Sequence, residues 1–153
     1  MHKHPQQLDR TLGGARPHRD SSRVATVATP YEGKGNVVDY TGRTQWSFMF
    51  VCPADLQAEA DRIFAAHAEW MQRTHHREGD KALLQYTVTK GPHPERDDAV
   101  VYAMTEIYQS PAGVEDHSKQ ARETFDDFPA FHALVGQSEG PWGINGTILH
   151  SLW

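Results

Sequence analysis

The chain has 153 residues, enough for a single domain with one hydrophobic core. Its formal net charge is −5 and its basic residues are scattered, which argues against binding to nucleic acid or to an anionic membrane surface. The only cysteine, Cys52, excludes a disulfide within the chain and, because it lies in an apolar run, is expected to be a small buried side chain.

The chain divides into a polar beginning and an apolar remainder. Residues 1–44 hold few large apolar side chains, whereas residues 45–153 hold nearly all of them. We therefore expect a largely flexible N-terminal arm over 1–44 and a folded domain over 45–153. The N-terminus lacks the apolar segment of a signal peptide, and no stretch approaches the roughly 20 apolar residues of a membrane span, so a cytoplasmic protein is expected.

The first half of the domain predicts a strand, a helix and a hairpin. Residues 44–53, TQWSFMFVCP, are aromatic and end at a proline, which is typical of a buried strand. Apolar residues at helical spacing follow over 54–76, with Asp55 as the expected N-cap. Residues 81–92 and 99–110 predict two strands joined by a short loop.

The second half predicts two further helices and a last strand. Ser110 and Pro111 are typical of a helix start, as N-cap and first helical residue. Residues 125–137 predict a short third helix that is broken at its proline. Residues 139–143 are expected to form a loop, and residues 144–153 to form the final strand.

The predicted order is β-α-β-β-α-β with a short extra helix, which is the ferredoxin-like α+β fold with an antiparallel sheet. The strand over 99–110 is apolar on both sides, since Val101 and Ala103 alternate with Tyr102 and Met104. One face of the sheet packs under the helices, and the other face needs a cover. A second copy of the chain supplies that cover most simply, so we expect a homodimer.

Residues 100–135, VVYAMTEIYQSPAGVEDHSKQARETFDDFPAFHALV, resemble the antibiotic-biosynthesis-monooxygenase-like family of the dimeric α/β-barrel superfamily. The pattern is an apolar strand ending Glu-x-Tyr, a helix cap, a helix histidine and an aromatic-rich short helix. It is carried by Glu106, Tyr108, Ser110, Ala112, His117, Phe128 and Phe131. The resemblance extends over residues 45–153.

The resemblance implies a dimeric α/β barrel, in which the two sheets face each other and each subunit has a pocket between sheet and helices. Some members of the superfamily oxidise polycyclic aromatic substrates without metal or flavin. Others cyclise polyketides, degrade haem or have no shown activity, so the fold does not settle the function. Haem degradation would call for an Asn in the first strand and a Trp in the second helix. This chain has Gln45 and Ser47 in that strand and no Trp in that helix, so we do not expect that activity.

The segment HAEWMQRTHH raises the question of a metal or catalytic site. Its first histidine, His67, shares the apolar helix face with Trp70 and Met71, and is either a core histidine or a pocket histidine. A helical zinc pair needs histidines four residues apart, and position 71 is methionine, so no metal ligand is assigned. His75 and His76 are expected to end the helix, where a positive charge is mildly favourable.

Two further side chains carry possible chemistry. His117 shares a helix face with Val114 and Ala121 and is either structural or, as the resemblance implies, a pocket histidine. An imidazole suits the deprotonation of a phenol because its ordinary pKa is near 6.5. Glu106 is predicted to lie inside the sheet, where a carboxylate needs a partner, and is either structural or an acid or base.

The catalytic candidates are therefore His67, His117 and Glu106. The expected substrate-binding residues are Phe48, Trp70, Met71, Tyr86, Tyr102 and Met104, which are mostly aromatic and suit a flat ligand. We expect a cofactor-independent monooxygenase, or a related cyclase or isomerase, that acts on an aromatic or polyketide-like substrate. Two alternatives stay open: a non-catalytic small-molecule-binding or stress-response dimer, and a metal-assisted enzyme with histidine ligands.

Overall fold

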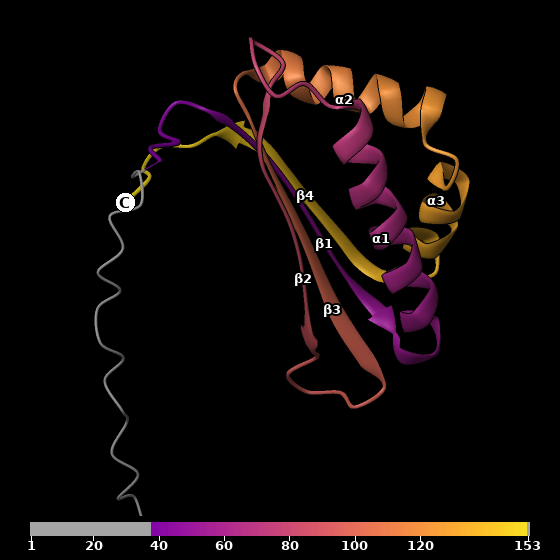
Figure 1. Cartoon of the computed structure of the whole chain (residues 1–153). Helices are drawn as coiled ribbons and strands as arrows, with labels where there is room; N and C mark the ends of the chain where they lie inside the picture. Colours follow the sequence, from indigo (N-terminus) through magenta and orange to yellow (C-terminus); the bar gives the residue numbers. More distant parts are fainter. Residues whose placement is uncertain (1–37, 153) are drawn as a thin grey trace, which may run out of the picture. The chain divides into compact units, whose positions relative to one another are not determined.

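The computed structural model describes residues 38–152. Most of the predicted arm, residues 1–37, and Trp153 of the predicted last strand lie outside the described residues. The described part contains four strands, β1 (Thr44–Pro53), β2 (Leu83–Pro92), β3 (Ala99–Tyr108) and β4 (Glu139–Thr147). It also contains three helices, α1 (Gln57–Thr74), α2 (Pro111–Thr124) and α3 (Phe128–Gly136) (Figure 1).

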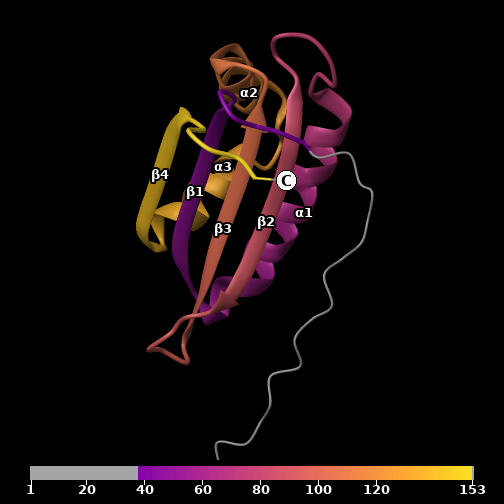
Figure 2. The same ribbon diagram turned by 90° about the vertical axis from the view of Figure 1, so that its left-hand side faces the viewer.

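The strands form one antiparallel sheet in the order β2-β3-β1-β4. The three helices cover one face of this sheet, and Figure 2 looks onto the other face, with the helices behind the strands. The two central strands, β1 and β3, are the first and third in the chain, which is the topology of the ferredoxin-like fold. The predicted fold class is confirmed.

The register of β1 and β3 decides which side chains meet under the helices. Trp46 lies opposite Glu106, Phe48 opposite Met104, and Phe50 opposite Tyr102. Because side chains alternate between the faces of a strand, these six residues project from the same face of the sheet. They are buried or partly buried, as expected for the face that the helices cover.

The apolar core is densest where β1 ends and β3 begins. The rings of Phe50, Tyr102 and Phe64 stack on one another, with centroids 5.4 to 6.1 Å apart. Ile63 of α1 and Cys52 of β1 are fully buried beside them, so Cys52 is the small buried side chain that the sequence predicted.

The start of α1 differs from the prediction, and the start of α2 agrees with it. Residues Ala54–Leu56 form a turn of 3₁₀ helix directly after Pro53, so Asp55 lies inside this turn and Leu56 is the N-cap, without a side-chain hydrogen bond. At α2 the Oγ of Ser110 accepts a hydrogen bond of 3.1 Å from the backbone N–H of Ala112, as a capping serine does.

The last helix and strand also differ from the prediction. Pro129 lies in the first turn of α3 and starts the helix rather than breaking it, because a first-turn proline has no hydrogen bond to lose. The predicted loop over 139–143 is the first half of β4, where Trp142 pairs with Met49. Pro141 is tolerated there because β4 is an edge strand, with β1 on one side only.

The open face of the sheet presents large apolar side chains to solvent. Met49, Trp142 and Ile144 project from β1 and β4 and are 45%, 72% and 64% exposed. No helix in the described part of the chain is both long enough and apolar enough to cross a membrane.

Candidate functional site

A cavity of about 290 Å³ lies between the sheet and the helices α2 and α3. Aromatic and aliphatic side chains form most of its wall: Trp46, Phe48, Met104, Ala121, Phe125, Phe128, Phe131 and Val135. The polar lining consists of His67, His117, Ser118, Arg122 and His132. The two groups share one cavity because α2 presents residues 117, 118, 121 and 122 on one face, at helical spacing, and Phe125 follows as its C-cap.

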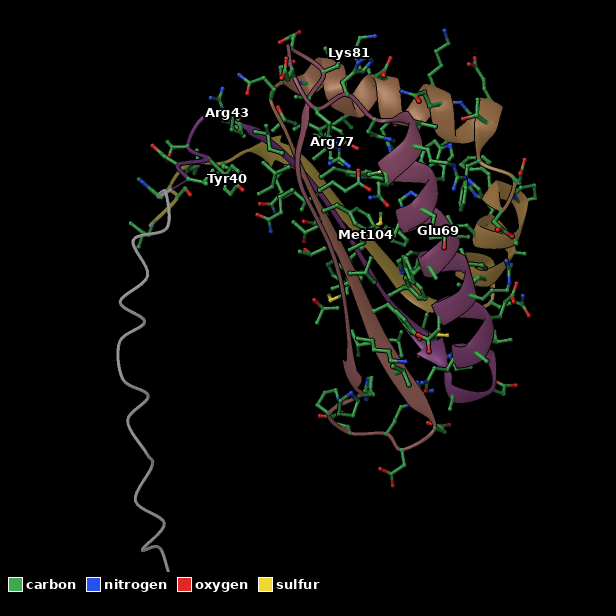
Figure 3. All side chains as sticks on the ribbon, viewed as in Figure 1. Tyr40, Arg43, Glu69, Arg77, Lys81 and Met104 are labelled. Carbon is green, nitrogen blue, oxygen red and sulfur yellow. The ribbon has the colours of Figure 1, made fainter. Side chains whose placement is uncertain are left out.

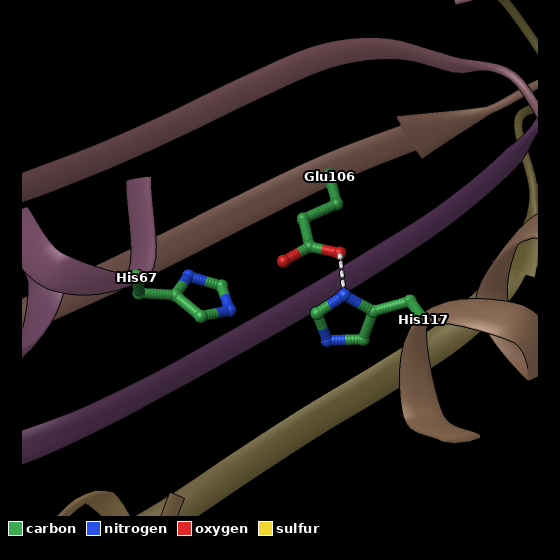
Figure 4. Close-up of side chains that lie close together, drawn as sticks. All are labelled: His67, Glu106 and His117. Carbon is green, nitrogen blue, oxygen red and sulfur yellow. Dashed lines mark ion pairs between the residues drawn. The ribbon is translucent and has the colours of Figure 1, made fainter. Parts of the chain in front are cut away.

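The three predicted catalytic residues lie together beside this cavity. His67 comes from α1, Glu106 from β3 and His117 from α2, and each contributes a nitrogen or oxygen atom within 4.8 Å of the other two. All three are buried, with Glu106 fully so. Figure 4 shows the Glu106 carboxyl group directed toward both imidazole rings.

Glu106 has a hydrogen-bond partner for one of its two carboxyl oxygens. Its Oε2 accepts a hydrogen bond of 2.5 Å from the hydroxyl of Tyr108 and lies 3.8 Å from Nδ1 of His117. Its Oε1 has no hydrogen-bond partner among the described residues. Burial raises the pKa of Glu106 to about 8, and the Tyr108 hydrogen bond opposes that rise only in part. At neutral pH the carboxyl group is therefore mostly protonated.

His75 is a fourth member of this group, and the sequence analysis missed it. It does end α1, as predicted, since its backbone N–H donates to the carbonyl of Met71. Its side chain, however, is only 8% exposed, and its Nε2 lies 3.0 Å from Nδ1 of His117. Burial lowers the pKa of His75 to about 4, so it is not the positively charged helix end that the sequence predicted. His76 is the exposed neighbour, 3.6 Å from Asp116.

The hydrogen bonds around His75 fix the tautomers of both histidines. The single hydroxyl proton of Thr74 is donated to the carbonyl of Trp70 at 2.8 Å, so Oγ1 of Thr74 is an acceptor toward His75 Nδ1 at 3.0 Å. Nδ1 of His75 is then protonated and its Nε2 is the acceptor. It follows that Nδ1 of His117 donates to His75, and that Nε2 of His117 carries a lone pair.

This assignment holds while the imidazoles are neutral. Burial, together with a smaller effect of the neighbouring histidines, lowers the pKa of His117 to about 3 and that of His67 to about 4. Both rings are therefore uncharged at neutral pH. The ring of His117 lines the cavity. The site thus contains a neutral imidazole with a free lone pair beside an aromatic-walled space.

His67 and Trp70 are held by partners of their own. Nδ1 of His67 lies 2.9 Å from the hydroxyl of Tyr86, which orients the ring so that Nε2 is directed toward Glu106 and His117 (Figure 4). Nε1 of Trp70 donates to the hydroxyl of Thr124 at 3.0 Å. The Trp70 ring lies against His67, with centroids 5.4 Å apart, and thereby closes one side of the cluster.

The predicted substrate-binding residues fall into two sets. Phe48 and Met104 line the cavity, and Figure 3 shows Met104 projecting from β3 into the space between sheet and helices. Trp70, Met71, Tyr86 and Tyr102 do not line it. Trp70 and Tyr86 contact the histidines instead. Tyr102 donates a hydrogen bond of 2.7 Å to Asp61 and belongs to the apolar core.

Several cavity residues were not among the sequence candidates. Trp46 is directly against His117, with ring centroids 5.0 Å apart. Trp46 could have been predicted from the sequence, because it lies two residues before Phe48 and therefore on the same face of the strand. Phe125, Phe128 and Phe131 were visible as an aromatic cluster, but which of them face the cavity depends on the turn between α2 and α3.

Comparisons with known proteins bear on the fold alone. No protein-family model matches the sequence, and no curated protein matches it. A dimeric ferredoxin-like protein from an uncultured marine organism is similar in structure, with a TM-score of 0.53 and 16% identity over 72% of this chain and 99% of that chain. SnoaB, a cofactor-independent oxygenase from Streptomyces nogalater, has a TM-score of 0.48 and 16% identity over 73% of this chain and 98% of that chain. The chain therefore has the ferredoxin-like fold of the first of these structures, as the sequence resemblance implied.

Proposed function

We propose that the protein is an enzyme that removes a proton from a small, electron-rich aromatic substrate, as a cofactor-independent monooxygenase or a related cyclase or isomerase. The observation that carries this proposal is the chain of hydrogen bonds from Thr74 through His75 to His117. It leaves Nε2 of His117 with a lone pair, on a neutral ring that lines an aromatic cavity. A positioned imidazole is the commonest general base in proteins.

In the proposed reaction, Nε2 of His117 accepts a proton from a phenolic or enolic hydroxyl group, or from a carbon next to such a group. The resulting imidazolium is stabilised on its other edge, because its Nδ1–H donates to Nε2 of His75 at 3.0 Å. The substrate anion formed beside it also raises its proton affinity, since opposite charges favour each other's charged form. The electron-rich anion then reacts with O2 in an oxygenase, or within its own skeleton in a cyclase or isomerase.

The size and lining of the cavity support a small aromatic ligand. A volume of about 290 Å³ is at the lower end of the range for ligand pockets, about 300–1,000 Å³. The five aromatic rings of its wall favour a flat molecule of one or two rings over a larger polyketide.

The test is turnover of hydroxylated naphthalenes under O2 and under argon, with wild type and His117→Gln compared. We expect oxygen-dependent product with wild type and a loss of at least about a hundredfold in kcat with the variant, as is typical when a general base is removed. The matched control is His76→Gln, which replaces an exposed histidine and is expected to behave like wild type. Equal turnover by His117→Gln and wild type would contradict the role of His117. Binding without turnover in either atmosphere would support the alternative of a non-catalytic small-molecule-binding dimer.

A metal-assisted enzyme is the second candidate, because His67, Glu106 and His117 form a buried set of two imidazoles and one carboxyl group. Such a set is a common site for divalent transition metals, and Oε1 of Glu106 has no hydrogen-bond partner within residues 38–152. If Nδ1 of His117 were the ligand, its proton would have to move to Nε2, and the hydrogen bond between His117 and His75 would be lost. This cost makes the metal-free base the better-supported proposal.

Metal analysis of tag-free protein separates these two candidates. We expect less than about 0.1 equivalent of zinc, iron, manganese or cobalt, and no change in thermal unfolding when zinc is added. A stoichiometric metal that is lost in Glu106→Gln would replace the metal-free proposal with the metal-assisted one.

We further propose that the protein is a homodimer in which the open faces of two sheets pack together. Met49, Trp142 and Ile144 form an apolar patch on that face, and patches of this kind mark interaction sites. Analytical ultracentrifugation is expected to give a dimer for wild type and a weaker dimer for Trp142→Ser. A wild-type monomer at micromolar concentration would contradict the proposal.

A further inference from the structure

We propose that the substrate carries an anionic group, such as a carboxylate, which Arg122 binds at the mouth of the cavity. This inference rests on the proposed function, since it concerns the ligand of the same cavity. The polar side chains along the wall of the cavity differ in their burial. His67 and His117 are buried, whereas Arg122 and His132 line the cavity from exposed positions on α2 and α3. The cavity therefore runs from a neutral buried end to an exposed end that carries a positive charge.

The positive charge of Arg122 has no counter-ion in the described part of the chain. No acidic side chain of residues 38–152 lines the cavity, and Arg122 makes no ion pair with Glu123 or Asp126, although both lie close in sequence. Two other arginines of this protein, by contrast, are held in ion pairs with acidic side chains. Arg62 pairs with Glu59 and Asp127, and Arg96 pairs with Asp98 and Glu139, all at 2.7 to 3.0 Å. The guanidinium group of Arg122 is available for a ligand.

The spacing along α2 matches a ligand that reaches both ends of the cavity. Arg122 follows His117 by five residues, which corresponds to about 7.5 Å along the helix axis. An acidic hydroxyl group at His117 and a carboxylate at Arg122 can belong to one aromatic molecule of two fused rings. Ser118, one turn before Arg122, lines the same side of the cavity and adds a hydroxyl donor.

Arginine is suited to this role because its planar guanidinium group can hold both oxygens of a carboxylate at once. Since the chain has a net charge of −5, an unpaired arginine at a cavity mouth also provides a local attraction that the protein as a whole does not. A neutral analogue of the same shape would fill the cavity but would leave this interaction unmade.

The experiment compares the binding of 6-hydroxy-2-naphthoate with that of its methyl ester, followed by quenching of tryptophan fluorescence. We expect the acid to bind wild type about tenfold more tightly than the ester, as one charge-assisted hydrogen-bonded pair provides. In Arg122→Gln protein the acid and the ester are expected to bind alike. Arg73→Gln, which removes an exposed arginine of α1 outside the cavity, is expected to keep the tenfold preference.

The possible results separate this inference from the proposed function. Equal binding of acid and ester to wild type, or an unchanged preference in Arg122→Gln, would overturn the role of Arg122 and leave the aromatic cavity in place. Binding of neither compound would overturn both the proposed small aromatic substrate and this inference. Thermal unfolding of each variant serves as the check that the fold is intact.

Discussion

The two ends of the sheet face that the helices cover are built from the same two strands, β1 and β3. One end is packed with apolar side chains, and the other contains buried polar groups. Where β1 ends and β3 begins, Phe50 lies opposite Tyr102 and their rings stack on Phe64. At the other end Trp46 lies opposite Glu106, whose carboxyl group is fully buried and has one oxygen without a hydrogen-bond partner in the described part of the chain. The apolar end therefore stabilises the fold, whereas the polar end lowers stability and provides the groups for chemistry.

The largest expected effect contrasts two phenylalanines of β1. Phe50 is almost fully buried in the stacked core, while Phe48 lines the cavity and is partly buried. We expect Phe50→Ala to lower the free energy of unfolding by about 3–5 kcal/mol, and Phe48→Ala to lower it by clearly less, because its site is already hollow. Urea unfolding measures both. A larger loss for Phe48→Ala would contradict the division into a packed end and a hollow end.

A second prediction concerns how Glu106, at the polar end, changes the stability of the protein as pH rises. The pKa of Glu106 is raised to about 8 in the folded protein, so the folded state binds more protons than the unfolded state between pH 4.5 and 8. The stability of the wild type is therefore lost as pH rises through this window. Glu106→Gln does not titrate there.

We expect the stability of Glu106→Gln relative to wild type to increase by about 4 kcal/mol from pH 5 to pH 9, in the presence of a chelator. Glu69→Gln, at an exposed position of α1, is the control and should show no such trend. A flat difference for Glu106→Gln would mean that folding does not raise the pKa of Glu106, which would contradict the prediction.

The third prediction concerns the loss of stability at acidic pH that the buried histidines cause. The pKa values of His67 and His75 are lowered to about 4, and that of His117 to about 3. The unfolded state therefore binds more protons below pH 6.5, and stability is lost as pH falls from 6.5 toward 4. We expect a loss on the order of 1–2 kcal/mol for each histidine, which urea unfolding between pH 7 and 4.5 would measure. His75→Gln should reduce the loss, and His76→Gln should not.

The fold could be predicted largely from local patterns. β1 and α1 follow from the alternation and helical spacing of apolar residues, and Ser110 caps α2 as its sequence context indicates. β4 could not be placed correctly, because its first half is a strand only through pairing with β1, which is a contact distant in sequence. Pro141 and the two neighbouring glycines carry the local signal of a loop.

The candidate site was predictable in part for a similar reason. His67, Glu106 and His117 each lie on the inner face of a helix or strand. The periodicity of each element is therefore enough to place their side chains between the helices and the sheet. His75 lies just beyond the last turn of α1, where the backbone is extended, with φ −83° and ψ 144°. The direction of its side chain depends on that change of backbone conformation and on α2 beside it, and neither is encoded in the spacing.

We infer that His117, which lines the cavity, carries an unprotonated Nε2 because His75 and Thr74 fix its tautomer. Nitrogen-15 NMR of histidine-labelled protein at pH 7 tests it directly, with the signals assigned by comparison with His117→Gln and His75→Gln. We expect a protonated Nδ1 and an unprotonated Nε2 on both His75 and His117. A proton on Nε2 of His117, or a positively charged ring, would contradict it.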